Sequence, residues 1–142
     1  NGQQGPKGDT GPPGPGTSTS FGFAYSQSES FESGNIKFNI AGPCQDVSLI
    51  REGLKVSKAG VYQISYKVIL NTTALTCNPS RFQIAINDAI KIESSLSEST
   101  TSATLTSTEL FSLLEGDVVK LVAELHERFS YKLATLQIIQ VG

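Results

Sequence analysis

The sequence has 142 residues and a formal net charge of −2 at pH 7, from 11 basic and 13 acidic side chains. Because the lysines and arginines are scattered rather than clustered, the charge pattern argues against nucleic acid or an anionic membrane surface as a partner. No apolar run approaches the about 18 residues that a membrane-spanning helix needs, so no segment is expected to span a membrane.

The first sixteen residues carry glycine in a strict period of three. Glycine occupies positions 2, 5, 8, 11 and 14, and four of the six prolines lie in the same range. This is the Gly-x-y pattern of collagen, in which only glycine fits at the axis of three polyproline II strands. A flexible Gly/Pro linker would need no such period. The repeat therefore predicts a collagen-like stub over 1–16 and, because one chain cannot form a collagen helix, a homotrimer.

The collagen-like stub is too short to be stable alone. Five triplets make a rod of only about 45 Å, which offers little to offset the ordering of three chains. The sequence also begins at Asn1, with no methionine, signal peptide or apolar targeting segment. We therefore expect the sequence to be the C-terminal portion of a longer protein.

Residues 17–20 are polar and predict a junction, and residues 21–142 are numerous enough for one domain with a proper core. This region has no long helical periodicity, whereas runs with a two-residue alternation recur between turn signals. Strands are predicted at 21–25, 36–40, 47–50, 54–57, 61–68, 81–86, 105–114, 119–125 and 133–141. Such spacing is typical of a β-sandwich or jelly roll of about eight to ten strands.

The clearest strand runs from residue 61 to residue 68. Its even positions are apolar and three of its four odd positions are polar, which indicates a half-buried strand. The apolar side chains of this strand are Tyr62, Ile64, Tyr66 and Val68. We expect them to pack against the opposing sheet, where the alternating residues are Val119, Leu121 and Leu125. Turns are predicted at Asn87-Asp88 and at Glu115-Gly116-Asp117.

The last predicted strand places apolar side chains on both of its faces, at Leu136, Ile138 and Ile139. In a two-sheet sandwich one face of a strand meets the core and the other meets solvent. A second apolar face therefore predicts that these residues contact another subunit. A central strand that is well covered within one subunit is the alternative, because short apolar runs are ambiguous.

Residues for chemistry are few. His126 is the only histidine and lies where a strand is expected to run into a turn, which favours a solvated loop residue over a catalytic one. Four aspartates (Asp9, Asp46, Asp88 and Asp117) are far apart, with no Asp-x-Asp spacing to hold calcium. No glycine-rich phosphate loop is present. The sequence predicts no catalytic site, no metal and no cofactor, and therefore a protein that is not an enzyme.

The two cysteines, Cys44 and Cys77, allow two interpretations. A secreted domain with two cysteines often closes one disulfide, which here would stabilise the fold by about 3–4 kcal/mol. The alternative is a pair of independent free thiols. We take the bridge within one subunit as the prediction.

Two motifs resemble the globular heads of complement-type proteins. Residues 58–66, KAGVYQISY, are similar to the Gly-x-Tyr-x-(apolar)-x-(aromatic) strand of those heads. Residues 114–121, LEGDVVKL, resemble their Leu-x-x-Gly-Asp-x-Val-x-Leu turn and strand. Both motifs occur in the family's order behind a collagen tract. The resemblance implies the ten-strand jelly roll shared with tumour necrosis factor, assembled as a tight homotrimer; some animal heads of this family also bind calcium near the trimer apex.

Within this superfamily the sequence is more similar to the bacterial branch, the collagen-like glycoproteins of Bacillus spore surfaces. These proteins join Gly-x-x triplets to a head of this size, and their last strand is aliphatic, like residues 136–141 (LQIIQV). The likeness implies an extracellular location, on a cell or on the spore exosporium, and an O-linked glycan at Thr10 of Gly-Asp-Thr. An animal secreted protein and a phage or viral fibre are the other origins.

The predicted function is structural. The head is expected to trimerise, bring three collagen strands into register and present its distal loops to other surface-layer proteins, host receptors or glycans. The alternative is a secreted recognition head, an adhesin or receptor ligand, whose loops bind one specific partner.

Overall fold

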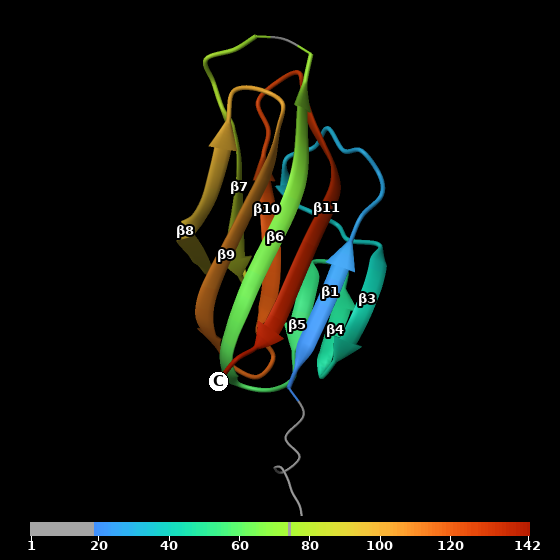
Figure 1. The fold of residues 1–142 in the computed structure, drawn as a ribbon, viewed down its shortest axis with the longest axis vertical. Coiled ribbons are helices and arrows are strands. Elements are labelled where there is room, and N and C mark those ends of the chain that lie inside the picture. The colour runs from blue at the N-terminus through green and yellow to red at the C-terminus, as the bar shows by residue number, and fades with distance from the viewer. Residues whose placement is uncertain (1–18, 74) are drawn as a thin grey trace, which may run out of the picture.

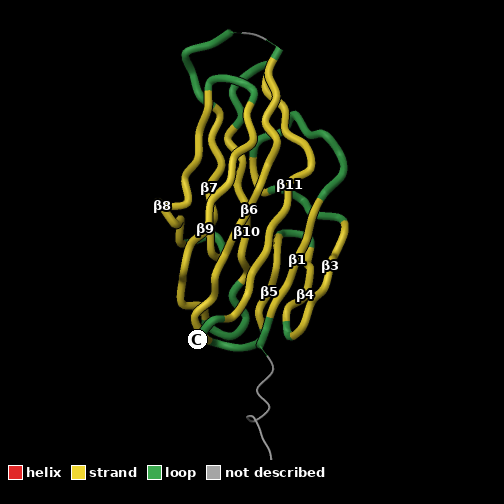
Figure 2. The backbone as a smooth tube through the Cα atoms, viewed as in Figure 1, coloured by secondary structure: helices red, strands yellow, loops and turns green. Residues whose placement is uncertain are grey.

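The structure is a computed structural model that describes residues 19–73 and 75–142. The predicted collagen-like stub over 1–16, with the proposed glycan carrier Thr10, lies outside the described residues, as do residues 17 and 18 of the predicted junction. The described residues form strands and loops without any helix, which confirms the prediction of an all-β jelly-roll sandwich (Figures 1 and 2).

Two antiparallel sheets make up the sandwich (Figure 1). The five-stranded sheet has the order β3-β1-β11-β6-β9 and contains β1 (Phe21–Tyr25), β3 (Ile40–Gln45), β6 (Gly60–Thr72), β9 (Ala103–Leu113) and β11 (Phe129–Gln140). The second sheet has the order β4-β5-β10-β7-β8, with β2 also paired to β10. Its strands are β2 (Gly34–Asn35), β4 (Val47–Ile50), β5 (Gly53–Val56), β7 (Ser80–Ile86), β8 (Ile90–Ser99) and β10 (Val118–Glu124).

The two-residue period of β6 places one face of this strand in the core. The side chains that sequence analysis assigned to the core strand are buried between the sheets: Tyr62, Ile64, Tyr66 and Val68 of β6, and Val119 and Leu121 of β10. Leu125 lies just after β10 and is half-buried against the same core. Every one of these side chains thus loses most of its contact with water, which is the main stabilising contribution in a sandwich of this kind.

One predicted strand is wrong. Residues 36–39 alternate between buried and exposed, as the prediction requires. The amide of Ile36 donates to the carbonyl oxygen of Leu121 at 2.8 Å, but residues 36–39 are not paired as a strand. They connect β2, which pairs with β10, to β3 of the other sheet. A segment that crosses between the sheets can bury alternate side chains without belonging to either ladder.

The strand that follows, β3, escaped prediction because it contains Gly42 and Pro43. Both residue types are depleted in strands, and proline cannot donate to a ladder. β3 lies at the edge of the five-stranded sheet, the position where a strand tolerates proline. A register shift opposite residues 22–24 of β1 accommodates the Gly-Pro pair.

The two predicted turns form at one end of the second sheet and are joined to each other. The carboxylate of Asp117 accepts a hydrogen bond from the amide of Leu114 at 2.8 Å and closes the β9–β10 turn. The side-chain amide of Asn87, in the β7–β8 turn, donates to the other oxygen of that carboxylate at 3.1 Å. Asp117 therefore satisfies the backbone of its own turn and links it to the neighbouring one.

The start of β1 and the C-terminus lie at the same end of the sandwich (Figure 1). The amide of Gln140 donates to the carbonyl oxygen of Ser20 at 2.8 Å, and the amide of Ser20 donates to Oε1 of Gln140 at 3.3 Å. This pair of bonds ties the point where the chain enters β1 to the last strand.

Candidate interaction face

The outer face of the five-stranded sheet, which points away from the core, is the candidate functional surface. Strand register arranges its side chains in three rows that run across β1, β11, β6 and β9. The first row, nearest the start of β1, contains Phe21, Ile139, Gln63 and Leu110. The second row contains Phe23, Gln137, Ser65 and Thr108, and the third contains Tyr25, Thr135, Lys67 and Thr106.

The three rows differ in polarity. Three of the four side chains in the first row are apolar, and Leu110 is 66% exposed. In the second row, Ser65 and Thr108 form a hydrogen bond of 3.2 Å between their hydroxyls. The third row carries the ammonium group of Lys67 on an exposed side chain. The outer face is thus most hydrophobic at the end where β1 begins.

The aromatic side chains of β1 point outward because the inner side has no room for them. A Cβ on Gly22 would lie 2.4 Å from Cγ1 of Val47, so only glycine fits the inner side at this position. Ala24, the other inward residue of β1, is fully buried. The alternation of large and small residues in β1 therefore places Phe21, Phe23 and Tyr25 on the outer face.

An apolar hollow of about 310 Å³ opens on the outer face at the β1 edge of the first two rows. The residues that line it, which define the apolar hollow from here on, are Phe21, Gly22, Phe23, Pro43, Gln137, Ile138 and Ile139. The Phe23 ring lies over Gly42, where an added Cβ would come within 2.6 Å of Cδ2 of the ring. Glycine at position 42 thus lets the ring form one wall of the hollow.

The predicted subunit interface on the last strand needs correction. Leu136 and Ile138 are fully buried inside the sandwich, because they occupy the inward positions of β11 between β1 and β6. Ile139 alone of the three points to the outer face and is partly exposed. Phe21, Phe23 and Leu110 also lie on the outer face but were not among the predicted interface residues, although the alternation of Phe and small residues in β1 indicates an outward aromatic row.

The predicted disulfide is also wrong. Both cysteines are free and exposed. Cys44 lies near the end of β3 and pairs with Gly22 at the start of β1, whereas Cys77 lies in the β6–β7 connection at the opposite end of the sandwich (Figure 1). A disulfide requires the two Cα atoms to come within about 7 Å, which this separation precludes within one subunit.

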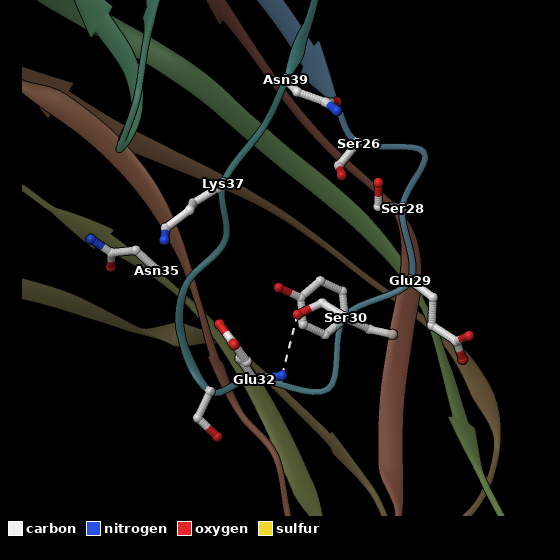
Figure 3. A pocket seen from close by; sticks show the side chains of 10 residues that line it. Ser26, Ser28, Glu29, Ser30, Glu32, Asn35, Lys37 and Asn39 are labelled. Atoms are coloured by element: carbon white, nitrogen blue, oxygen red, sulfur yellow. Dashed lines mark hydrogen bonds between the residues drawn. The ribbon is translucent and has the colours of Figure 1, made fainter.

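A second hollow, polar in character and about 500 Å³ in volume, is formed mainly by residues 26–39 (Figure 3). We define the polar hollow by its lining residues: Ser26, Ser28, Glu29, Ser30, Glu32, Ser33, Asn35, Lys37, Asn39 and Tyr131. Paired backbone hydrogen bonds between Ser30 and Tyr131, of 2.8 and 3.0 Å, fasten the loop to β11. Burial raises the pKa of the Tyr131 phenol, a hydrogen bond with Ser30 lowers it in part, and the charge of Glu32 raises it further.

His126 and the acidic side chains are the remaining candidates for chemistry among the described residues. His126 lies after β10, with its amide donating to the hydroxyl of Ser80 at 2.9 Å and its Nδ1 buried without a partner among the described residues. Over residues 19–73 and 75–142, no cluster of three or more His, Cys, Asp or Glu side chains could hold a metal ion. The same residues include no helix that could cross a membrane.

No known family profile and no curated protein matches the sequence. Solved structures match the fold at low identity. Murine APRIL matches with a TM-score of 0.65 and 10% identity, over 87% of this chain and 100% of that chain. The globular domain of zebrafish complement 1qA protein has a TM-score of 0.65 and 12% identity, over 87% and 98% of the two chains. Eiger TNF from S. frugiperda has a TM-score of 0.62 and 13% identity, over 87% and 94%. At these identities the likeness establishes the fold.

Proposed function

We propose that this chain is the trimerising head of a collagen-like filament at an extracellular surface, of a cell or of a spore. The observation that carries the proposal is the position of the apolar first row. It lies at the end of the sandwich where β1 begins, directly after a Gly-x-y segment whose glycine period requires three chains. Three copies that associate through this apolar face would contact one another at the end of the sandwich where their collagen strands converge.

The outer face supports the proposal energetically. Leu110 is largely exposed in one copy, and full burial of a leucine side chain contributes about 1.5–3 kcal/mol. Phe21, Phe23 and Ile139 add partly exposed apolar area on the same face. Closed trimers would cover this area and remove a surface that otherwise favours aggregation. In this arrangement the head registers the collagen strands and leaves the loops at the far end free for contacts with other surface components.

Light scattering coupled to gel filtration tests the proposal. Residues 19–142 contain the whole core, so a fragment of residues 17–142 retains every described element. We expect both this fragment and the 142-residue chain to have the mass of three copies at micromolar concentration. A monomer mass for the fragment of residues 17–142 would overturn the proposal.

The polar hollow favours a second function, recognition of a hydroxylated ligand such as a sugar. Hydroxyl groups, side-chain amides, the amine of Lys37 and the carboxylate of Glu32 line it, and these groups form hydrogen bonds to polyols in both directions. NMR titration of the chain with a panel of monosaccharides would test this function. We expect shifts confined to residues 26–39 that Lys37→Ala weakens; no shift in this loop at millimolar sugar would overturn it.

A further inference from the structure

We infer that Leu110 of each copy occupies the apolar hollow of the next copy in the trimer. This inference rests on the proposed function, because it needs a second copy as the occupant. It identifies which residues make the contact and in which direction the copies follow one another. Leu110 is 66% exposed on β9, and the apolar hollow of about 310 Å³ opens on the same face at β1.

Leu110 cannot fill the hollow of its own copy. β9 and β1 stand at opposite sides of the face, with β6 and β11 between them. Three spacings between neighbouring strands separate them, a distance of about 14 Å, far more than a leucine side chain spans. The exposed side chain and the hollow can therefore meet only between two copies.

The two features lie at the same level along the sheet. Phe21 pairs with Ile139, Ile139 with Gln63, and Gln63 with Leu110, so the hollow and Leu110 share the first row. If residues 1–16 form the predicted collagen helix, three chains would enter their β1 strands side by side. Contacts between copies would then join residues at the same height along the threefold axis. The offset between collagen chains is one residue, about 3 Å, which is less than the about 7 Å between successive rows.

The collagen-like segment also identifies the occupant as another copy of this chain. It ends a few residues before Phe21, which lines the hollow, and its glycine period demands two further chains at that place. Contacts between a projecting side chain on one edge and a hollow on the other edge are head-to-tail. Such contacts close into a ring when the rotation between copies allows it, as a threefold axis does.

Only the first row can make this contact. The corresponding β9 residues of the second and third rows are Thr108 and Thr106, which offer hydroxyls in place of an aliphatic side chain. Slipping one copy along the other by a row would bring Thr108 to the hollow and leave Leu110 in water. The contact therefore fixes how the copies are aligned along the threefold axis, and this alignment in turn fixes the register of the collagen strands.

Disulfide cross-linking in the 142-residue chain tests the contact. The background is Cys44→Ser with Cys77→Ser, which removes the two exposed native thiols. Into it we would introduce Leu110→Cys together with Pro43→Cys, the first on β9 and the second at the rim of the hollow. Mild oxidation is expected to produce a covalent trimer on a non-reducing gel that returns to one chain on reduction. The control pair is Thr104→Cys with Pro43→Cys. Pro43 lies near the second row, and Thr104 lies on β9 three rows from Leu110 and two rows from Pro43, so this pair is expected to remain uncross-linked.

A substitution without new cysteines gives a second measurement. Leu110→Asp is expected to weaken trimer association by about tenfold or more, because a leucine that would be buried becomes charged. Thr106→Asp on the same strand is the matched control and is expected to change it by much less.

The outcomes separate the two proposals. A chain that is monomeric by light scattering overturns both the proposed function and this inference. A trimer that gives no covalent trimer with the Leu110/Pro43 pair, or that cross-links equally with the control pair, overturns the inference and leaves the proposed function standing.

Discussion

The phenolic oxygen of Tyr66 lies 2.6 Å from the main-chain carbonyl oxygen of Ser95, a hydrogen bond that joins the two sheets across the core. Tyr66 belongs to β6 of the five-stranded sheet and Ser95 to β8 of the other. Ser97 Oγ, at 2.9 Å, and the carbonyl oxygen of Phe82, at 3.2 Å, surround the same hydroxyl. The buried ring thus has its one polar group satisfied by the edge of the opposite sheet.

Removing this hydroxyl is expected to destabilise the fold. Tyr66→Phe leaves a buried carbonyl without its donor and should lower the free energy of unfolding by about 1–3 kcal/mol. Tyr66→Ala also creates a cavity and should lower it by about 3–5 kcal/mol. Lys91→Ala, at an exposed position of β8 in the other sheet and away from the proposed trimer face, is the control and should change it by about 0.5 kcal/mol or less. Urea unfolding followed by circular dichroism at one protein concentration measures all three; equal small effects would contradict the role of Tyr66.

Alkaline pH should unfold the protein through its buried phenols. Burial raises the pKa of Tyr66, with a lesser opposing effect from Ser97 and a further increase from Glu109, and burial likewise raises the pKa of Tyr131. The stability that the neutral phenols contribute is complete below their unfolded pKa of about 10 and is lost as the pH rises through the higher folded values. The urea midpoint should therefore fall above about pH 10, and fall less in the Tyr66→Phe/Tyr131→Phe variant. An equal decrease of the urea midpoint with pH in the unsubstituted protein and in the double variant would be evidence against this mechanism.

The buried ammonium group of Lys120 provides a third prediction. The Lys120 residue is 3% exposed, and its Nζ lies 2.6 Å from Oδ1 of Asp88, whose side chain is largely in water. Asp88→Asn should therefore cost about 1 kcal/mol, since solvent screens the attraction. Lys120→Met should be neutral or stabilising, because it removes the cost of desolvating the charge. Thermal melts of both variants test this prediction. A Lys120→Met variant that melts at a lower temperature than Asp88→Asn would contradict it.

The two thiols should react independently in the folded protein. Cys44 and Cys77 are both exposed, and they lie at opposite ends of the sandwich. We expect alkylation of the native, unreduced chain to add two adducts by intact mass, and prior reduction to change nothing. A chain that resists alkylation until it is reduced would restore the disulfide that sequence analysis predicted.

Attachment of the head should speed the refolding of the collagen-like region. Collagen strands associate slowly and can slip by a triplet, because each Gly-x-y unit resembles the next. Three heads joined at their β1 ends would hold the strands at about millimolar effective concentration or above. The polyproline II signal in circular dichroism should return faster after a heat pulse with the head than without it. Equal rates and equal melting points would instead favour the recognition head.

The sequence by itself determined the features that depend on neighbouring residues in the chain. The two-residue period of 61–68 placed Tyr62, Ile64, Tyr66 and Val68 on one face, because the side chains of a strand alternate whatever it pairs with. Turn residues located the β7–β8 hairpin at Asn87 and the turn between the two sheets at Gly116 for a similarly local reason. The glycine period indicated three chains because the collagen axis excludes every other side chain.

Only the tertiary structure decided what depends on distant segments. It placed Ile138 inside and Phe21 outside, because Val47 of another strand leaves room only for glycine on the inner side of β1. It made 36–39 a crossing between sheets rather than a strand, and put the two cysteines at opposite ends. The register of β1, β11, β6 and β9 places Leu110 in the same row as Phe21. This register is set by long-range strand pairing, which no local sequence pattern encodes.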